Sequence, residues 1–192
     1  MIRIVVIDDH PALRAGVHTV IDSEPGLVFV GESDGTEESV WPLLRRTGPD
    51  VVLLDYHLPT GDGLQLSHQI KRQPTPPRVL LYSAYASPPL ALPALLAGAD
   101  GLIDKGLPAR DLYESIRRVS RGERLVPEVS RYLLGEALAD LDDADRRVVG
   151  LLLDGTSDAD VAEALRIAPA EVEQATRRIL SRLSANVQIA AG

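Results

Sequence analysis

The chain has 192 residues, of which 45% are hydrophobic and 25% are charged, and its formal net charge is −8. This length suits one large globular domain or two small ones, and no apolar run approaches the roughly 20 residues that a membrane helix needs. The lack of cysteine excludes disulfides and thiolate metal sites, and the early acidic residues argue against a signal peptide. We therefore expect a cytoplasmic protein with no membrane partner and no general attraction to nucleic acid.

The first 120 residues alternate between short apolar runs and amphipathic segments. Apolar runs that predict buried strands lie at 2–7, 27–31, 51–55, 79–82 and 101–104. Helical spacing of apolar residues follows each run: after Pro11, around 40–47, over 64–71, around 90–97, and across 112–119. Five strand–helix repeats predict an α/β fold, a doubly wound five-stranded parallel sheet with helices on both faces. We expect the strand order 2-1-3-4-5.

The pattern changes near Arg121. Residues 122–140 show no strand–helix rhythm and read as a linker, with a possible helix at 128–138. From Leu141 onward the spacing is helical: Gly155 ends one helix, Ser157 is placed to cap the next, and Pro169 begins the last. We therefore predict a first domain at 1–121, a linker at 122–140, and a small all-α helix-turn-helix domain at 141–192.

Polar residues follow four of the predicted strands. Asp8 and Asp9 follow the first strand, Asp55 ends the third in VVLLDYHLPTGDG, Ser83 follows the fourth, and Lys105 follows the fifth. The carboxyl ends of parallel strands share one edge, so we expect these groups to converge. Carboxylates about 5 Å apart repel by roughly 3 kcal/mol per pair at an effective dielectric near 20, which favours a bound cation. Oxygen ligands suit Mg²⁺, and a carboxylate can accept a phosphoryl group as nucleophile.

These residues carry a resemblance to a known family. IVVIDDHPALRAGV, VVLLDYHLPTGDG, VLLYSA and GADGLIDKG resemble the receiver domain of bacterial two-component response regulators, and 141–185 is similar to a LuxR-type helix-turn-helix. The whole chain thus resembles a NarL/FixJ-type regulator.

The resemblance implies specific roles for the residues at the sheet edge. Asp55 would be phosphorylated by a histidine kinase, and Mg²⁺ would be bound by Asp9 and Asp55 directly, by Asp8 through water, and by the main-chain carbonyl of His57. Ser83 and Lys105 would contact the phosphoryl group, and the chain would form a homodimer on activation. Many receivers carry an aromatic residue where this chain has Leu102, so the aromatic part of the switch is assigned to nearby Tyr85.

The DNA-facing part of the predicted helix-turn-helix departs from the family. Its last helix carries early acidic residues, and residues 137–192 hold six arginines against ten acidic residues. Phosphate contacts dominate DNA affinity and need cations. The candidate DNA contacts are Gln174, Arg177, Arg178 and Arg182, although the arginines could equally form a solvated face. The alternative function is therefore a receiver whose degenerate helix-turn-helix binds protein instead of DNA.

Simpler interpretations exist for each position. Asp55 could merely end a strand, and Asp8–Asp9 could only cap a helix, but all the motifs together, in order, favour the receiver. A phosphatase of the haloacid dehalogenase type needs Asp-x-Asp after its first strand, whereas this acidic pair is adjacent, so we do not expect an enzyme. The four histidines show no ligand spacing and are not expected to form a metal site.

Overall fold

The computed structural model describes residues 1–59, 61–84 and 86–191, with side chains up to residue 187 in the last helix. The sheet has the predicted topology. Five parallel strands lie in the order β2-β1-β3-β6-β7, which is the expected order 2-1-3-4-5. Their bounds are β1 Ile2–Ile7, β2 Leu27–Ser33, β3 Val51–Asp55, β6 Arg78–Ser83 and β7 Gly101–Asp104.

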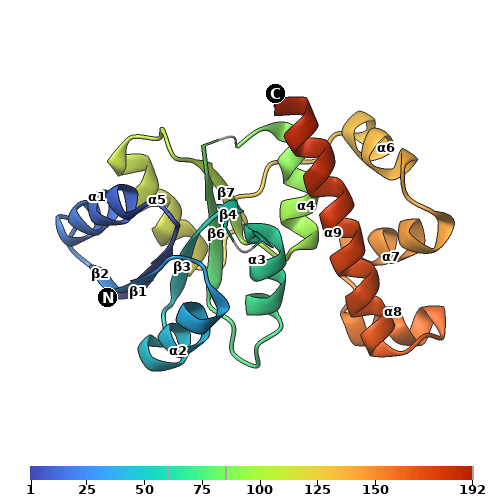
Figure 1. The fold of residues 1–192 in the computed structure, drawn as a ribbon, viewed down its shortest axis with the longest axis horizontal. Coiled ribbons are helices and arrows are strands. Elements are labelled where there is room, and N and C mark those ends of the chain that lie inside the picture. Colours follow the sequence, from blue (N-terminus) through green and yellow to red (C-terminus); the bar gives the residue numbers. More distant parts are fainter. Residues whose placement is uncertain (60, 85, 192) are drawn as a thin grey trace.

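Helices cover both faces of this sheet (Figure 1). One face packs against α1 (Pro11–Asp22) and α5 (Ala109–Ser120), which contribute Val17, Ile21 and Ile116 to its apolar core. The opposite face packs against α2 (Glu37–Thr47), α3 (Gly63–Lys71) and α4 (Ala91–Leu96), the last preceded by the 3-10 turn η1 (Pro88–Leu90). β3 is buried along its whole length because helices lie on both sides of it.

The loop predicted after β3 contains a small hairpin. β4 (His57–Leu58) pairs antiparallel with β5 (Gly61–Asp62), and the Asp62 side chain then caps α3 by accepting a hydrogen bond from the Gln65 backbone N–H. Gly63 allows this chain to return over the end of β3, since a Cβ there would lie 2.0 Å from the Asp55 carbonyl oxygen. Any larger residue at Gly63 would therefore push the hairpin away from Asp55.

The C-terminal part is entirely helical after the linker. It contains α6 (Arg131–Ala139), α7 (Asp143–Leu153), α8 (Asp158–Leu165) and α9 (Pro169–Ala191). Two of the predicted helix ends are present. Gly155 adopts a φ of +82° just after α7, and the Ser157 hydroxyl accepts from the Asp160 backbone N–H at the start of α8. Among the helices described, none combines the length and apolarity needed to cross a bilayer.

Helix α9 joins the two parts of the molecule. It lies across α3 and α4 on one side and contacts α7 and α8 on the other (Figure 1). Its buried residues Ile179, Leu183 and Val187 belong to the same apolar cluster as Leu64 of α3 and Leu92 of α4. One continuous apolar core therefore links the sheet to the C-terminal helices.

Candidate functional site

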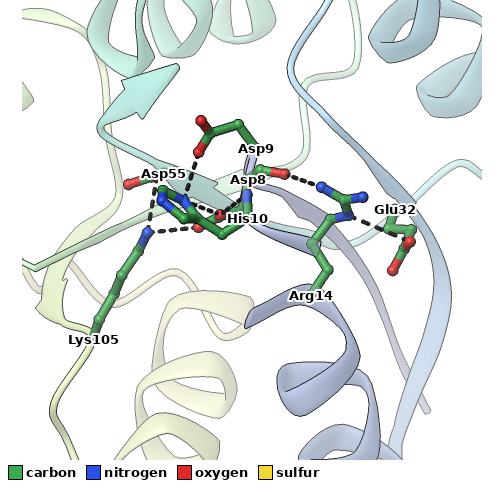
Figure 2. A network of polar contacts seen from close by, with 7 residues as sticks. All are labelled: Asp8, Asp9, His10, Arg14, Glu32, Asp55 and Lys105. Carbon is green, nitrogen blue, oxygen red and sulfur yellow. Dashed lines mark hydrogen bonds and ion pairs between the residues drawn. The ribbon is translucent and has the colours of Figure 1, made fainter. Parts of the chain in front are cut away.

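Three of the predicted residues meet at the carboxyl edge of the sheet. Lys105, just after β7, places its Nζ 2.6 Å from Asp8 Oδ2 and 2.9 Å from Asp55 Oδ2. Asp8 and Asp55 are both buried, and Figure 2 shows the lysine reaching toward them from below. The predicted convergence of these groups is therefore present, with the lysine ammonium held between two carboxylates.

Asp9 and His10 lie beside Asp8 and Asp55 in the same cluster. One ligand atom from each of Asp8, Asp9, His10 and Asp55 lies within 4.8 Å of the others. His10 Nδ1 is 2.6 Å from Asp9 Oδ1 and 3.2 Å from Asp8 Oδ1. The sequence did not predict a role for His10, because the four histidines lack the spacing of metal ligands. Its position directly after Asp8 and Asp9 is the feature that could have placed it in this cluster.

Hydrogen bonds fix the backbone at the end of β1, where Asp8 lies. The His10 backbone N–H donates to Asp8 Oδ1 at 2.7 Å, and Arg14 Nη1 donates to the Asp8 carbonyl at 2.6 Å. Arg14 Nε also lies 3.3 Å from Glu32 Oε1, and this ion pair is drawn in Figure 2. These contacts hold the end of β1 in place, so the Asp8 carboxylate is directed toward Lys105.

The remaining predicted site residues have different positions. Ser83 is fully buried at the end of β6, and its carbonyl accepts from the Lys105 backbone N–H at 2.8 Å. His57 lies in the hairpin with an exposed side chain, and its backbone N–H hydrogen-bonds the Asp55 carboxylate. Leu102 packs in the apolar core of the α4 face. Tyr85 lies outside the described residues.

Burial and the neighbouring charges shift the pKa values of Asp55 and Lys105. Burial raises the pKa of Asp55 above its usual value, against the opposing effects of the Lys105 ammonium and the His57 backbone N–H. Burial disfavours the charge on Lys105, but hydrogen bonds to Asp8 and Asp55 outweigh that effect and raise its pKa. Lys105 therefore stays charged, and its ammonium favours the ionised form of Asp55 beside it.

The arginines proposed for DNA contact pair with carboxylates. Arg178 donates to both oxygens of Asp145, at 2.5 and 3.2 Å, and Arg182 Nη1 lies 3.4 Å from the same carboxylate. Arg177 Nη2 is 2.6 Å from Glu173 on its own helix. Gln174 is exposed and borders a hollow between α7, α8 and α9. DNA contact by these four residues stays a prediction.

Comparison with known proteins gives a consistent family. Residues 4–117 match the response regulator receiver domain. A probable transcriptional regulatory protein NarL of Mycobacterium tuberculosis (strain CDC 1551 / Oshkosh) is 30% identical, with 99% of this chain and 91% of that protein covered. The DNA-binding transcriptional activator DevR/DosR of M. tuberculosis (strain ATCC 25618 / H37Rv) is 28% identical, over 95% of this chain and 88% of that protein.

A solved structure supports the same assignment. The two-component response regulator of the LuxR family from Aurantimonas sp. SI85-9A1 is 29% identical and superposes with a TM-score of 0.62, over 72% of this chain and 99% of that one. The two relatives named above are a transcriptional activator and a probable transcriptional regulatory protein. Because the receiver family matches more than half of the chain and the NarL relative spans nearly all of it, this protein belongs to the NarL/LuxR family of two-component response regulators.

Proposed function

We propose that this regulator is switched by phosphorylation of Asp55 by a sensor histidine kinase, and that the C-terminal helix-turn-helix is its output. The observation that carries the proposal is the meeting of Asp8, Asp55 and Lys105 at one buried sheet edge. We also propose the division into a receiver at 1–121, a linker at 122–140 and an output domain at 141–192. The family resemblance and the two sets of packed helices support it.

The donor set at the site fits Mg²⁺. Asp9 Oδ1 is buried within the cluster, 2.6 Å from His10 Nδ1, and carboxylate oxygens are ligands that suit a hard divalent cation. Asp9 and Asp55, the His57 main-chain carbonyl, and Asp8 through water would hold the ion. When bound, Mg²⁺ supplies neutralising charge for phosphoryl oxygens.

Phosphoryl transfer uses the side chains at this edge of the sheet. An Asp55 carboxylate oxygen bonds to phosphorus while the bond from phosphorus to the kinase's imidazole nitrogen breaks, leaving the electron pair on that nitrogen. Lys105 stays protonated and pairs with the charge added to Asp55, while the Ser83 hydroxyl binds a phosphoryl oxygen. Tyr85 is assigned to the switch by the family resemblance alone.

The route from Asp55 to the output helix is short. Tyr56, the next residue, is buried and lies with its hydroxyl 2.8 Å from Ser184 Oγ of α9. Phosphorylation adds roughly −1.5 to −2 charge beside it. We propose that the resulting rearrangement weakens the contact between α3, α4 and α9, and that the released chains form homodimers.

The C-terminal helices have two candidate binding partners, DNA and another protein, and a different observation favours each. DNA binding is favoured by the DNA-binding relative, DevR/DosR. Binding to a protein is favoured by the pairing of Arg177, Arg178 and Arg182 with carboxylates, which leaves few free cations for phosphates. DNA binding is the leading proposal. Gel-shift titration of the phosphorylated chain with genomic fragments across a salt series separates the two: saturable, sequence-selective shifts support DNA, and their absence supports a protein partner.

Labelling by a small phosphodonor such as acetyl phosphate tests the switch itself. We expect Mg²⁺-dependent addition of one phosphoryl group to the wild type, seen by intact-protein mass spectrometry, and none to Asp55→Asn. Asp62→Asn is the matched control, because it removes a carboxylate from the same loop while leaving Asp55 in place. Labelling that persists in Asp55→Asn would remove Asp55 from its proposed role.

A further inference from the structure

We propose that a cavity between the two domains binds a small organic cation. The cavity measures about 360 Å³ and lies where α4, α6 and the C-terminal half of α9 approach one another. Figure 1 shows the end of α9 passing between α4 and α6. This volume is at the lower end of the range of small-molecule sites in proteins.

The walls are apolar and come from three parts of the chain. They include Pro89, Leu92 and Pro93 of the receiver, Leu133 of α6, and Leu183 and Val187 of α9. Leu92, Pro93, Leu183 and Val187 are themselves buried, so the floor of the cavity is continuous with the core. The body of a ligand that enters it must therefore be apolar.

The charged side chains that line the cavity are both acidic. Glu136 and Asp140 line the cavity, and no lysine, arginine or histidine is among its lining residues within the described part of the chain. Asn186 donates to Asp140 Oδ2 at 3.4 Å. Glu136 makes no ion pair with a described residue. This charge distribution selects a cation and disfavours an anion.

Both carboxylates also occupy positions that α6 by itself disfavours. They are four residues apart on one face of the helix, where like charges repel. Asp140 is the C-terminal cap, where the helix dipole is negative and an acidic residue is unfavourable. Arg146 already donates to the Leu138 and Ala139 carbonyls at that helix end. The effect that a bound cation would relieve is therefore the repulsion between the two carboxylates.

Tyr132 adds an aromatic surface to the mouth. Its side chain is 73% exposed, it lines the cavity, and it precedes Glu136 by one helical turn. An ammonium group beside Glu136 would therefore lie within reach of the ring face, which attracts cations. The ligand class is an amine or amidine with an apolar body of fragment size.

Occupation of this cavity has a consequence that rests on the proposed function. The ligand contacts the receiver, the linker helix and the output helix together, so it favours the arrangement in which α9 is docked. Phosphorylation and the ligand would then oppose each other, and by linkage each would weaken the effect of the other by the same factor.

Three probes with one skeleton test the charge selection: 4-phenylbutylamine, 4-phenylbutanol and 4-phenylbutyrate. Each is titrated into the full chain by ligand-observed NMR. We expect the amine to bind more tightly than the alcohol, and the alcohol more tightly than the acid. Equal affinity for all three, or preference for the acid, would overturn the proposal.

Variants locate the site. Glu136→Gln/Asp140→Asn should weaken the amine by about three- to tenfold and leave the alcohol unchanged. Glu37→Gln/Glu38→Gln on α2 is the matched control, because it removes the same charge from a remote exposed surface. Amine affinity that falls equally in both variants would overturn the assignment. Ala137→Phe, which fills the cavity from α6, should abolish binding of all three probes, and retained binding would place them elsewhere.

The variants at the mouth lie on an exposed helix face and should fold, which circular dichroism verifies. These titrations need neither phosphorylation nor a DNA or protein partner. Their failure would therefore leave the phosphorylation proposal intact, and failure of Asp55 labelling would leave the cavity proposal intact.

Discussion

At the scale of single residues, His68 is held in a neutral form. It lies on α3 against α9, its exposed fraction is 5%, and its Nε2 is buried without a hydrogen-bond partner. Its pKa is lowered to about 4, chiefly by burial and also by repulsion from Arg72 and Arg177, while Glu173 acts in the opposite direction. Protonation of His68 therefore opposes the packing of α3 against α9.

This position predicts a pH-dependent stability. Because the folded pKa is below the ordinary value of 6.5, the unfolded chain binds the proton first as the pH falls. The contribution of neutral His68 is fully present above about pH 6.5 and is lost as the pH approaches 4, by at most about 3 kcal/mol. His68→Phe should flatten the pH dependence of urea unfolding between pH 7 and 5.

His18→Phe serves as the control for that substitution, because His18 is a half-buried histidine of α1, on the sheet face opposite to the one that α3 and α9 cover. It should retain the pH dependence of the wild type. Equal pH dependence in the wild type and His68→Phe would show that His68 does not titrate in this way.

At the scale of elements, α9 contacts α3 and α4 through apolar residues and α7 through ion pairs. Its apolar face packs on α3 and α4, and its arginines reach Asp145 of α7, whose side chain is completely buried. The hydrogen bonds that Arg178 donates to Asp145 raise the pKa of Arg178, so its guanidinium stays charged. Arg178 and Arg182, two of the three arginines predicted to contact DNA, thus hold α7 and α9 together.

Asp145→Asn should separate these two roles. We expect the free energy of unfolding to fall by about 1–3 kcal/mol, because a charge-assisted, two-point contact is lost. We also expect stronger non-specific DNA binding in low salt, since Arg178 and Arg182 become available to phosphates.

Asp143→Asn is the matched control for DNA affinity. Asp143 lies in the same helix with a side chain 89% exposed, and its loss changes the net charge equally without freeing Arg178. If both variants bind DNA with the same increased affinity, net charge explains the effect and the arginines of α9 do not.

At the scale of the whole molecule, the docked arrangement depends on a few polar contacts around a continuous core. Gln65 Nε2 donates to the Arg177 carbonyl at 2.8 Å, and Arg72 of the receiver pairs with Asp158 of α8. The hydrogen bond between Tyr56 and Ser184 is the one that begins beside Asp55. Loss of that contact should therefore loosen the interface most directly.

Tyr56→Phe removes this contact and keeps the ring. We expect about 1 kcal/mol of lost interface stability and faster hydrogen exchange in α9 without phosphorylation. Tyr113→Phe is the control, because it removes a hydroxyl that donates to Val20 within the receiver. Unchanged exchange of α9 in Tyr56→Phe would exclude this hydrogen bond as the link between the sheet edge and α9.

Much of this molecule followed from local pattern alone. Buried runs that end in Asp8, Asp55 and Lys105 predicted both the sheet order and the cluster, because parallel strands deliver their carboxyl ends to one edge. Gly155 and Ser157 likewise marked helix ends, since capping depends on residues only a few positions apart.

The tertiary structure alone decided which distant side chains meet. Tyr56 and Ser184 are 128 positions apart, and Arg178 and Asp145 are 33 apart, so no periodicity links them. How α9 docks depends on the fit of its whole apolar face against α3 and α4. The sequence therefore determined the elements and the sheet edge, whereas docking determined which polar groups pair and where a cavity remains.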